Sequence, residues 1–229
     1  MRTYLFAILL CSIGLANAQT YEVGAFLGGS NYIGDVGSEA YINPNQLAIG
    51  GLGKWNLSSR YSYRVSLIYS ELVGDDAQSS SNARKARGLS FSNKMLEVSA
   101  GMEFNFTEFD LHDFSKPFTP YLYGGVSVLM HDNLYYDSAS NVAQADGNKN
   151  AIAIPMAVGA KGKIGQHWVL GAEVGARYAI TDNLDGSNPT AQISDAQRFG
   201  NVYSDDWYVF TGITLTYTFI RKPCYVCFD

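Results

Sequence analysis

Hydrophobic and polar residues alternate with a period of two in eight segments of this chain. Residues 207–219 show the pattern most clearly, because one face of this segment is apolar and begins and ends with an aromatic residue, while the other face is mostly small or polar. Such alternation is typical of a β-strand that buries one face. The segment is long enough to cross a bilayer, since a tilted strand needs roughly 9 to 11 residues to do so.

Seven earlier segments repeat the alternation. They are residues 20–28, 46–56, 61–71, 90–106, 119–130, 151–164 and 167–180. The segment 46–56 is the weakest, because Gly50, Gly51 and Gly53 interrupt it. The sequence therefore does not decide which face of this segment points inward, or whether the segment contains a β-bulge. The connections alternate between long and short, and an even number of strands places both termini of the chain on one side of the membrane.

A single strand cannot cross lipid, because its backbone donors and acceptors would lack partners. The pattern therefore predicts an all-β fold, an eight-stranded antiparallel transmembrane β-barrel with long extracellular loops, short periplasmic turns and a short C-terminal periplasmic tail. A soluble barrel of the lipocalin type is the alternative, with the apolar face turned inward around a ligand. Alternation alone does not separate the two, but the long polar loops and the aromatic strand ends favour lipid outside.

The N-terminus supports a membrane location. Residues 1–18 predict a secretory signal peptide, with Arg2 ahead of an apolar run and Ala16-Asn17-Ala18 as the cleavage site. The barrel then occupies residues 19–220 and the tail residues 221–229, and the expected location is the cell outer membrane, with its lipid as one partner. The net charge of −5 excludes the strongly basic surface typical of nucleic-acid binding. No small-molecule substrate is expected.

Charged residues on the predicted inward faces form a candidate lumen charge network. Its members are Arg64, Glu97, Glu103, Lys161, Glu173 and Arg177. The interior of an eight-stranded barrel is just wide enough for side chains to fill, and unpaired charges there would be costly. We therefore expect cations and carboxylates to pair across the lumen and to close it to conduction.

Groups that could carry chemistry are scattered. His112 and His167 fall in predicted turns and His131 at the loop end of a strand, so they lie on opposite sides of the membrane and predict no metal or cofactor site. Ser127 and His131 share a face but lie about 13 Å apart along the strand. Nucleophilic catalysis requires the hydroxyl and the base in contact. No catalytic residue is expected, and a small lipid-modifying enzyme is the weakest alternative.

Cys224 and Cys227 form a CxxC motif close to the C-terminus. In an oxidising periplasm a small disulfide between them is the favoured interpretation. A metal site would need two further ligands, and a contact with a partner protein is the remaining alternative.

Several stretches together carry a family resemblance. They are YEVGAFLGGSNYIGDVG at residues 21–37, Lys54-Trp55-Asn56, RGLSF at 87–91, EVSAGMEFNF at 97–106 and KPFTPYLYGG at 116–125. In these the chain resembles the PorG-type outer-membrane barrels of the Bacteroidetes type IX secretion system. The first motif is fairly specific, whereas PYLYGG recurs in unrelated barrels. The resemblance implies a non-enzymatic accessory component that associates with a periplasmic ring, built from a lipoprotein and its partner protein.

If the resemblance holds, the partner surface lies on the periplasmic rim. The turn at residues 107–118 is longer than the other periplasmic turns, and the tail follows the last strand. The candidate docking residues are Phe109, Asp110, Leu111, His112, Asp113, Phe114, Arg221, Lys222, Tyr225 and Phe228. A turn folded back over the barrel mouth is the alternative for 107–118. A stand-alone structural or adhesive barrel that acts through its extracellular loops is the alternative for the whole chain.

Overall fold

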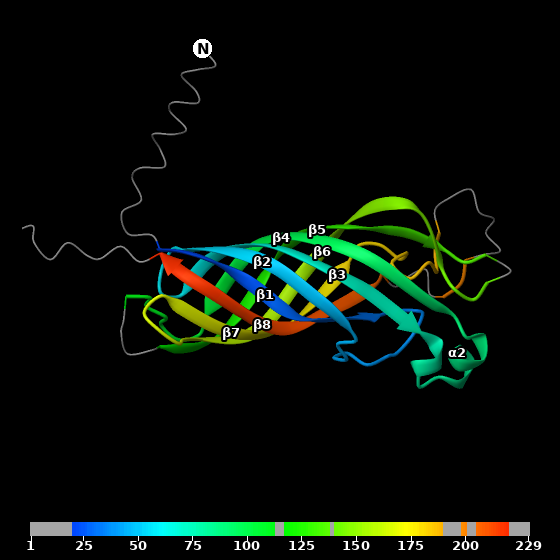
Figure 1. The fold of residues 1–229 in the computed structure, drawn as a ribbon, viewed down its shortest axis with the longest axis horizontal. Helices are drawn as coiled ribbons and strands as arrows, with labels where there is room; N and C mark the ends of the chain where they lie inside the picture. The colour runs from blue at the N-terminus through cyan, green and yellow to red at the C-terminus, as the bar shows by residue number, and fades with distance from the viewer. Residues whose placement is uncertain (1–19, 113–116, 138–139, 190–197, 201–204, 220–229) are drawn as a thin grey trace, which may run out of the picture.

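Eight antiparallel strands close into a barrel in which β1 pairs with β8 (Figure 1). The computed structural model describes residues 20–112, 117–137, 140–189, 198–200 and 205–219. The strands are β1 Thr20–Ile33, β2 Gln46–Asn56, β3 Tyr61–Asp75, β4 Ser90–Asn105, β5 Phe118–Tyr135, β6 Gln144–Lys163, β7 Trp168–Ala179 and β8 Trp207–Phe219. Every strand pairs with its neighbours in the chain. The predicted all-β, eight-stranded antiparallel barrel is confirmed.

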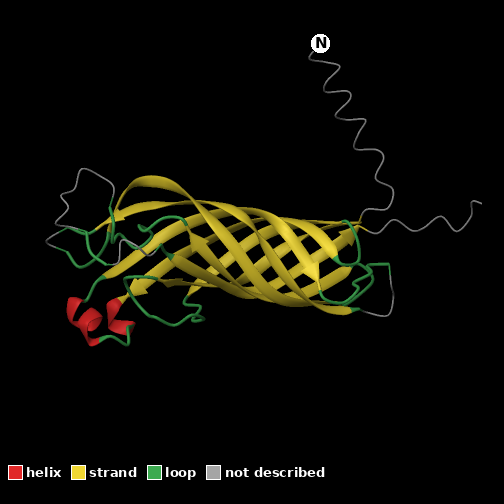
Figure 2. Cartoon of the chain, turned by 180° about the vertical axis from the view of Figure 1, so that it is seen from behind, coloured by secondary structure: helices red, strands yellow, loops and turns green. Residues whose placement is uncertain are grey.

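The connections differ in length between the two ends of the barrel. Short turns, residues 57–60 and 164–167, lie at the end where Tyr21 pairs with Phe219, together with the medium turn 106–117. The opposite, extracellular end carries the longer loops, and the β3–β4 loop there contains the 3-10 turn η2 Asp76–Gln78 and the helix α2 Asn82–Arg87 (Figure 2).

Four strands run further toward the extracellular end than their hydrophobic pattern predicts. β1 continues to Ile33, β3 to Asp75 and β5 to Tyr135, and β6 begins at Gln144. The outward side chains in these extensions are mostly polar, such as Asp75, Asp132 and Asn148, because the strands leave the lipid, although Ile33 and Val73 are still apolar. Backbone pairing continues without the period-two signal, since strand hydrogen bonds do not depend on side-chain polarity.

The β-bulge that the glycines of β2 suggested is absent from the described residues of that strand. Its register runs without a break against both β1 and β3. The register shift found in the barrel lies instead between Asp132 and Leu134 of β5, where β5 pairs with the polar start of β6. This irregularity lies beyond the lipid-facing wall, at the extracellular end of the barrel. A backbone group that loses its partner in the neighbouring strand there can bond to water instead, so the cost is small.

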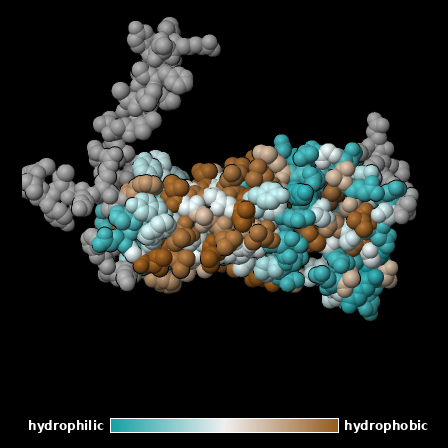
Figure 3. All heavy atoms as spheres, in the orientation of Figure 1, coloured by the Kyte–Doolittle hydropathy of each residue, from teal (hydrophilic) through white to brown (hydrophobic). Residues whose placement is uncertain are grey.

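The outer wall of the barrel is apolar and the charged residues lie inside. On the face shown in Figure 3, hydrophobic residues form a band across the middle of the barrel, and hydrophilic residues gather at the extracellular end. Val65, Val98, Val126 and Ile213 point outward and are exposed, whereas Arg64, Glu97 and other charged residues of the same strands are buried. This arrangement rules out the lipocalin alternative, because a wall of this composition requires lipid rather than water around it. No helix among the described residues is long and apolar enough to cross a membrane.

Aromatic side chains surround the periplasmic end of the apolar band. Tyr21, Trp55 and Tyr63 form a chain of ring contacts across β1, β2 and β3, with centroids 6.4 and 5.9 Å apart. On the other side Trp168 contacts Tyr217 at 5.3 Å. Amphipathic rings of this kind favour the level of the lipid headgroups. The girdle therefore fixes the depth of the barrel in the membrane.

The interior has two chemically different halves. Charged residues fill the periplasmic half, and a hydrophobic core fills the extracellular half. The core includes Phe26, Ile68, Leu72, Phe91, Met95, Leu129, Leu134, Leu184 and Phe210. Glycines make room for it, because a Cβ atom at Gly28 or Gly212 would lie within 2.9 Å of the Phe26 ring. The barrel is thus packed like a globular protein along this half of its length.

Candidate functional site

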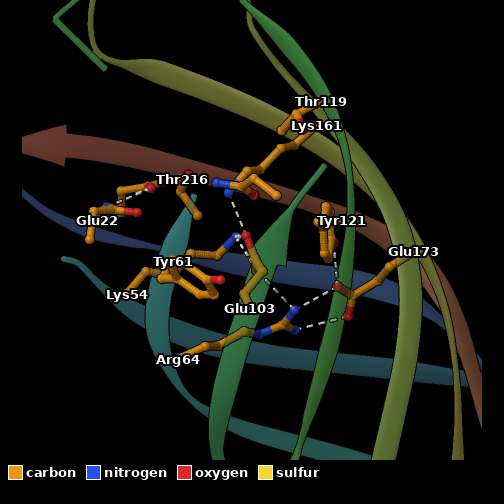
Figure 4. Close-up of polar contacts among 12 residues, drawn as sticks. Glu22, Lys54, Tyr61, Arg64, Glu103, Thr119, Tyr121, Lys161, Glu173 and Thr216 are labelled. Atoms are coloured by element: carbon orange, nitrogen blue, oxygen red, sulfur yellow. Dashed lines mark hydrogen bonds and ion pairs between the residues drawn. The ribbon is translucent and has the colours of Figure 1, made fainter. Parts of the chain in front are cut away.

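Arg64, Glu173 and Tyr121 form the most regular part of the charge network in the lumen (Figure 4). The guanidinium of Arg64 on β3 donates two hydrogen bonds to the Glu173 carboxylate on β7, at 2.6 and 2.9 Å. The Tyr121 hydroxyl donates to the same carboxylate at 2.6 Å. Bidentate pairs between Arg and a carboxylate are the strongest and most directional ion pairs in proteins. This pair links opposite walls of the barrel.

Glu103 of β4 is the centre of the second part. It accepts a hydrogen bond from Nζ of Lys54 at 3.1 Å and another from Nζ of Lys161, and Arg64 lies 4.0 Å away. Lys161 also lies 4.8 Å from the centre of the Phe109 ring. One carboxylate therefore pairs with cations from three different strands (Figure 4).

Arg177 and Glu97 form the third part, next to the hydrophobic core. Nε of Arg177 lies 3.5 Å from the Glu97 carboxylate, which also accepts a hydrogen bond of 2.6 Å from the Tyr208 hydroxyl. The Arg177 guanidinium stacks 4.5 Å from the centre of the Phe210 ring. All six residues of the candidate lumen network are thus buried inside the barrel, and each contacts an opposite charge.

Sequence reasoning missed two members of the network, Lys54 and Glu22. Lys54 was missed because the glycine-rich β2 left its inward face undetermined, and pairing with β1 and β3 now turns Lys54 inward. Glu22 is buried and accepts hydrogen bonds from Asn56 at 2.9 Å and Thr216 at 2.5 Å. Its polar position on β1 was the signal that could have identified it.

At the periplasmic mouth, the medium turn folds back into the barrel. Phe109 and Leu111 are buried against Val169, and Nζ of Lys163 donates to the Leu111 carbonyl at 2.5 Å. Two of the candidate docking residues, Phe109 and Leu111, are therefore part of a plug and do not face the periplasm. The physical reason is that apolar side chains beside a lumen gain more by covering it than by contacting water.

Other candidate docking residues of this turn are accessible. Asp110 and His112 are exposed, and the Asp110 carboxylate accepts from the His112 amide at 2.8 Å. Arg60 on the neighbouring turn lies 3.5 Å from Glu108, and both are solvent-exposed. Some predicted features lie outside the described residues: the signal peptide, Asp113, Phe114, and the tail with Arg221, Lys222, Tyr225, Phe228 and the Cys224–Cys227 motif.

At the extracellular mouth, the start of the β7–β8 loop covers the lumen. Leu184 is fully buried in the hydrophobic core, its amide donates to Asp206 at 2.8 Å, and its carbonyl accepts from Asn93 at 2.7 Å. Asp206 also accepts a hydrogen bond from the Tyr32 hydroxyl. We call residues 181–189 the extracellular cap.

A second set of bonds ties the neighbouring loops together above the membrane. The carboxylate of Asp76 accepts two bonds from Arg87 on α2, at 2.8 and 3.0 Å, and one from each of the amides of Gly37 and Leu89. Burial alone would raise the pKa of Asp76, but these donors lower it below its usual range. The carboxylate is therefore ionised and holds three segments in place.

Groups that could act in catalysis stay apart in the described residues. The Ser127 hydroxyl donates to the Ala153 carbonyl at 3.3 Å, and His131 lies against the Asp132 carbonyl. His112 and His131 lie at opposite ends of the barrel. Among the described residues no group of three or more His, Cys, Asp or Glu side chains is arranged to hold a metal ion.

The extracellular cap carries buried carboxyl groups that should respond to pH. Burial raises the pKa of Asp182 to about 6 and raises the pKa values of Asp185 and Asp206 as well. A raised folded pKa means that the folded cap favours the protonated acid. The stabilisation that these protonated acids give the folded cap is complete below the unfolded pKa of about 3.9. It is lost as pH rises through the folded values.

We therefore expect the cap to open more readily above pH 6 than at pH 4. The measurement is the hydrogen-exchange protection of the Leu184 amide, corrected for the intrinsic dependence of exchange on pH. Asp182→Asn keeps the oxygen that accepts from Asn188 and removes the titration of the group whose pKa is raised to about 6, so it should reduce the change in protection between the two pH values. Protection that rises with pH in the unmodified protein would contradict this account.

A closed antiparallel barrel with an apolar outer wall, a paired polar interior and covered mouths defines a small outer-membrane β-barrel protein. Within this class the chain belongs to a family described as Domain of unknown function (DUF6089), whose model matches residues 1–228. No curated protein matches the sequence.

Solved barrels are similar at low sequence identity. The N-terminal β-barrel domain of Pseudomonas aeruginosa OprF is 12% identical with a TM-score of 0.46, covering 87% of this chain and 97% of that chain. Neisserial surface protein A is 9% identical with a TM-score of 0.48, covering 88% and 97%. A major outer membrane protein from Thermus thermophilus is 15% identical with a TM-score of 0.46, covering 89% and 100%.

Proposed function

We propose that this barrel is a non-enzymatic accessory component of the type IX protein secretion system, which docks a periplasmic ring at the outer membrane. The ring is formed by a lipoprotein and its partner protein. The sequence resemblance to PorG-type barrels, which extends over nearly the whole chain that follows the predicted signal peptide, is the basis for naming this system. The observation that carries an anchoring role is the filled lumen, which leaves the two rims as the surfaces available for function.

The periplasmic rim supplies a candidate contact surface. Asp110 and His112 are exposed beside Arg60 and Glu108, so the rim presents both signs of charge around the buried plug residues. A small cavity of about 130 Å³ lies between the turn 57–60 and the turn that carries Asp110 and His112. Polar, mixed-charge surfaces of this type favour specific rather than merely adhesive contacts.

The test is a pull-down of the tagged protein from its native membrane in mild detergent, followed by mass spectrometry. Asp110→Ala combined with His112→Ala and deletion of residues 225–229 should reduce co-purification of the ring proteins by at least roughly tenfold, the effect of losing about 1.4 kcal/mol of binding free energy. The buried Phe109 is left unchanged so that the plug stays intact.

The matched control carries Lys85→Ala and Asp146→Ala, two exposed charges at the extracellular end. It should retain the ring proteins at the level of the unmodified barrel. Both variants must show the heat-dependent gel mobility of a folded barrel. Ring proteins that co-purify equally with the rim variant, or that are missing from the unmodified protein, would contradict the proposal.

A stand-alone adhesive barrel is the second candidate function. The β5–β6 hairpin favours it, because β6 begins at Gln144 and presents an exposed polar strand beyond the apolar wall. In that case the unmodified protein would purify without companions, and loss of residues 136–143 would abolish function while rim changes would not.

A further inference from the structure

A groove runs along the outer wall of the barrel below the β1–β2 loop. It has a volume of about 840 Å³ and is lined almost entirely by apolar side chains. Met156, Ala176 and Val209 lie side by side on β6, β7 and β8 and contribute to the lining. The groove is hollow here because alanine and valine stand between the larger side chains of Met156 and Trp207 on the same outer face.

The β1–β2 loop forms the upper wall of the groove. Tyr41 and Ile42 contribute to its lining, although they are 78% and 59% exposed. Exposed aromatic and aliphatic neighbours on a polar extracellular loop are costly in water. Contact with a lipid chain removes this cost, because the groove opens on the apolar band of the wall.

A polar pocket of about 300 Å³ adjoins the groove at its extracellular end. The two share Ile33, Tyr41 and Trp207 as lining residues. The acidic side chains of Asp35, Glu39, Asp205 and Asp206 line the pocket, with Arg84 as the cation among its lining residues. Burial raises the pKa of Asp206, so Asp206 is not counted as a charge here. The apolar groove therefore leads directly into a pocket with an excess of negative charge.

The charges in the pocket are held in place by neighbouring loops. Glu39 accepts hydrogen bonds from the Ser79 hydroxyl and the Ser80 amide, and these lower its pKa to about 2, so it is ionised. Asp205 accepts from the Tyr178 hydroxyl, while Asp206 is committed to Tyr32 and Leu184. Arg84 lies 3.8 Å from Glu39 and donates to the Gly37 carbonyl at 3.2 Å.

We propose that the groove and the pocket together bind one outer-leaflet lipid whose headgroup carries a primary amine. An acyl chain lies along Ala176 and Val209, and the ammonium group faces Glu39 and Asp205. Arg84 at the same pocket suits a phosphate next to the amine, since guanidinium groups pair well with phosphate oxygens. The site is independent of the periplasmic rim and of any ring partner.

The test is native mass spectrometry of the full barrel, purified in maltoside detergent and titrated with phosphatidylethanolamine or with phosphatidylglycerol of the same acyl chains. We expect one retained lipid per barrel, with phosphatidylethanolamine favoured by roughly fivefold, the factor that one partly exposed ion pair supplies. The combined variant Glu39→Gln and Asp205→Asn should remove this preference.

The groove itself is tested by Ala176→Phe, which fills it from the floor. The matched control is Ala172→Phe, the same change on the same outer face of β7 but outside the groove. Ala176→Phe should lose the retained lipid and Ala172→Phe should keep it, and Val174→Phe serves as a second groove variant should the first not fold.

Three outcomes would overturn the proposal. They are equal retention of the two lipids, a lipid that persists in a folded groove variant, and a dimer mass in place of the lipid, which would mean that a second copy of the chain covers the groove.

Discussion

Replacing Glu103 by alanine should lower the free energy of unfolding of the barrel by about 3–5 kcal/mol, the usual cost of leaving a buried charge without its partner. The Glu103 carboxylate accepts hydrogen bonds from both Lys54 and Lys161, and all three side chains are buried. Its loss leaves two ammonium groups without a counter-charge in a narrow lumen. Urea unfolding of the barrel in lipid vesicles measures the change.

Two comparisons make this prediction specific to charge. Glu108→Ala removes an exposed carboxylate that lies 3.5 Å from Arg60, and the unfolding free energy should change by less than about 0.5 kcal/mol. The combined variant Glu103→Leu, Lys54→Met and Lys161→Met replaces Glu103 and both lysines by apolar groups, leaves Arg64 paired with Glu173, and should recover much of the lost stability. A Glu103→Ala barrel as stable as the Glu108→Ala barrel would contradict the structure of the network.

Placing an arginine at Ile213 should destabilise the barrel by about 2–4 kcal/mol, the cost of a cation on the lipid face at the bilayer midplane. Ile213 is 49% exposed on the outer face and lies midway along β8, between Trp207 and Phe219 at its ends. A cation there can reach water only along half the height of the wall, in either direction. The same vesicle-based unfolding experiment measures the cost.

Ile164→Arg is the control for this effect of depth. Ile164 is also an exposed outward residue, but it lies in the turn between β6 and β7 at the edge of the apolar band. Its replacement should cost only about 0–1 kcal/mol, since an arginine at the edge reaches the headgroups. Equal costs at the two positions would mean that the outer wall does not face lipid.

The strands, their order and the direction of their faces could be predicted from the sequence because lipid imposes a simple pattern. Within lipid, outward side chains are apolar, so the alternation identifies Val65, Val98 and Ile213 directly as residues of the outer face. The pattern ends where the solvent changes. The polar ends of β5 and β6 continue as paired strands in water, and nothing in their side chains distinguishes them from a loop.

The site could be predicted in part, and each omission has a local cause. Arg64 and Glu173 lie on strands with clear alternation, so their inward direction followed from the sequence, but their bidentate pairing depends on the shear of the closed barrel. Lys54 was missed because the glycines of β2 have no side chains that show which face of this strand points inward. The burial of Phe109 depends on the open barrel mouth beside it, which is a tertiary feature.

Side chains fill the interior of the barrel, and single-channel recording in a planar lipid bilayer tests this claim most directly. Charged side chains pair across the periplasmic half of the lumen, the hydrophobic core fills the other half, and the turn with Phe109 and the cap with Leu184 cover the mouths. The account predicts that the purified, folded barrel inserts into the bilayer without any stepwise increase in conductance. Reproducible steps from the unmodified protein, with a stable open level, would contradict it.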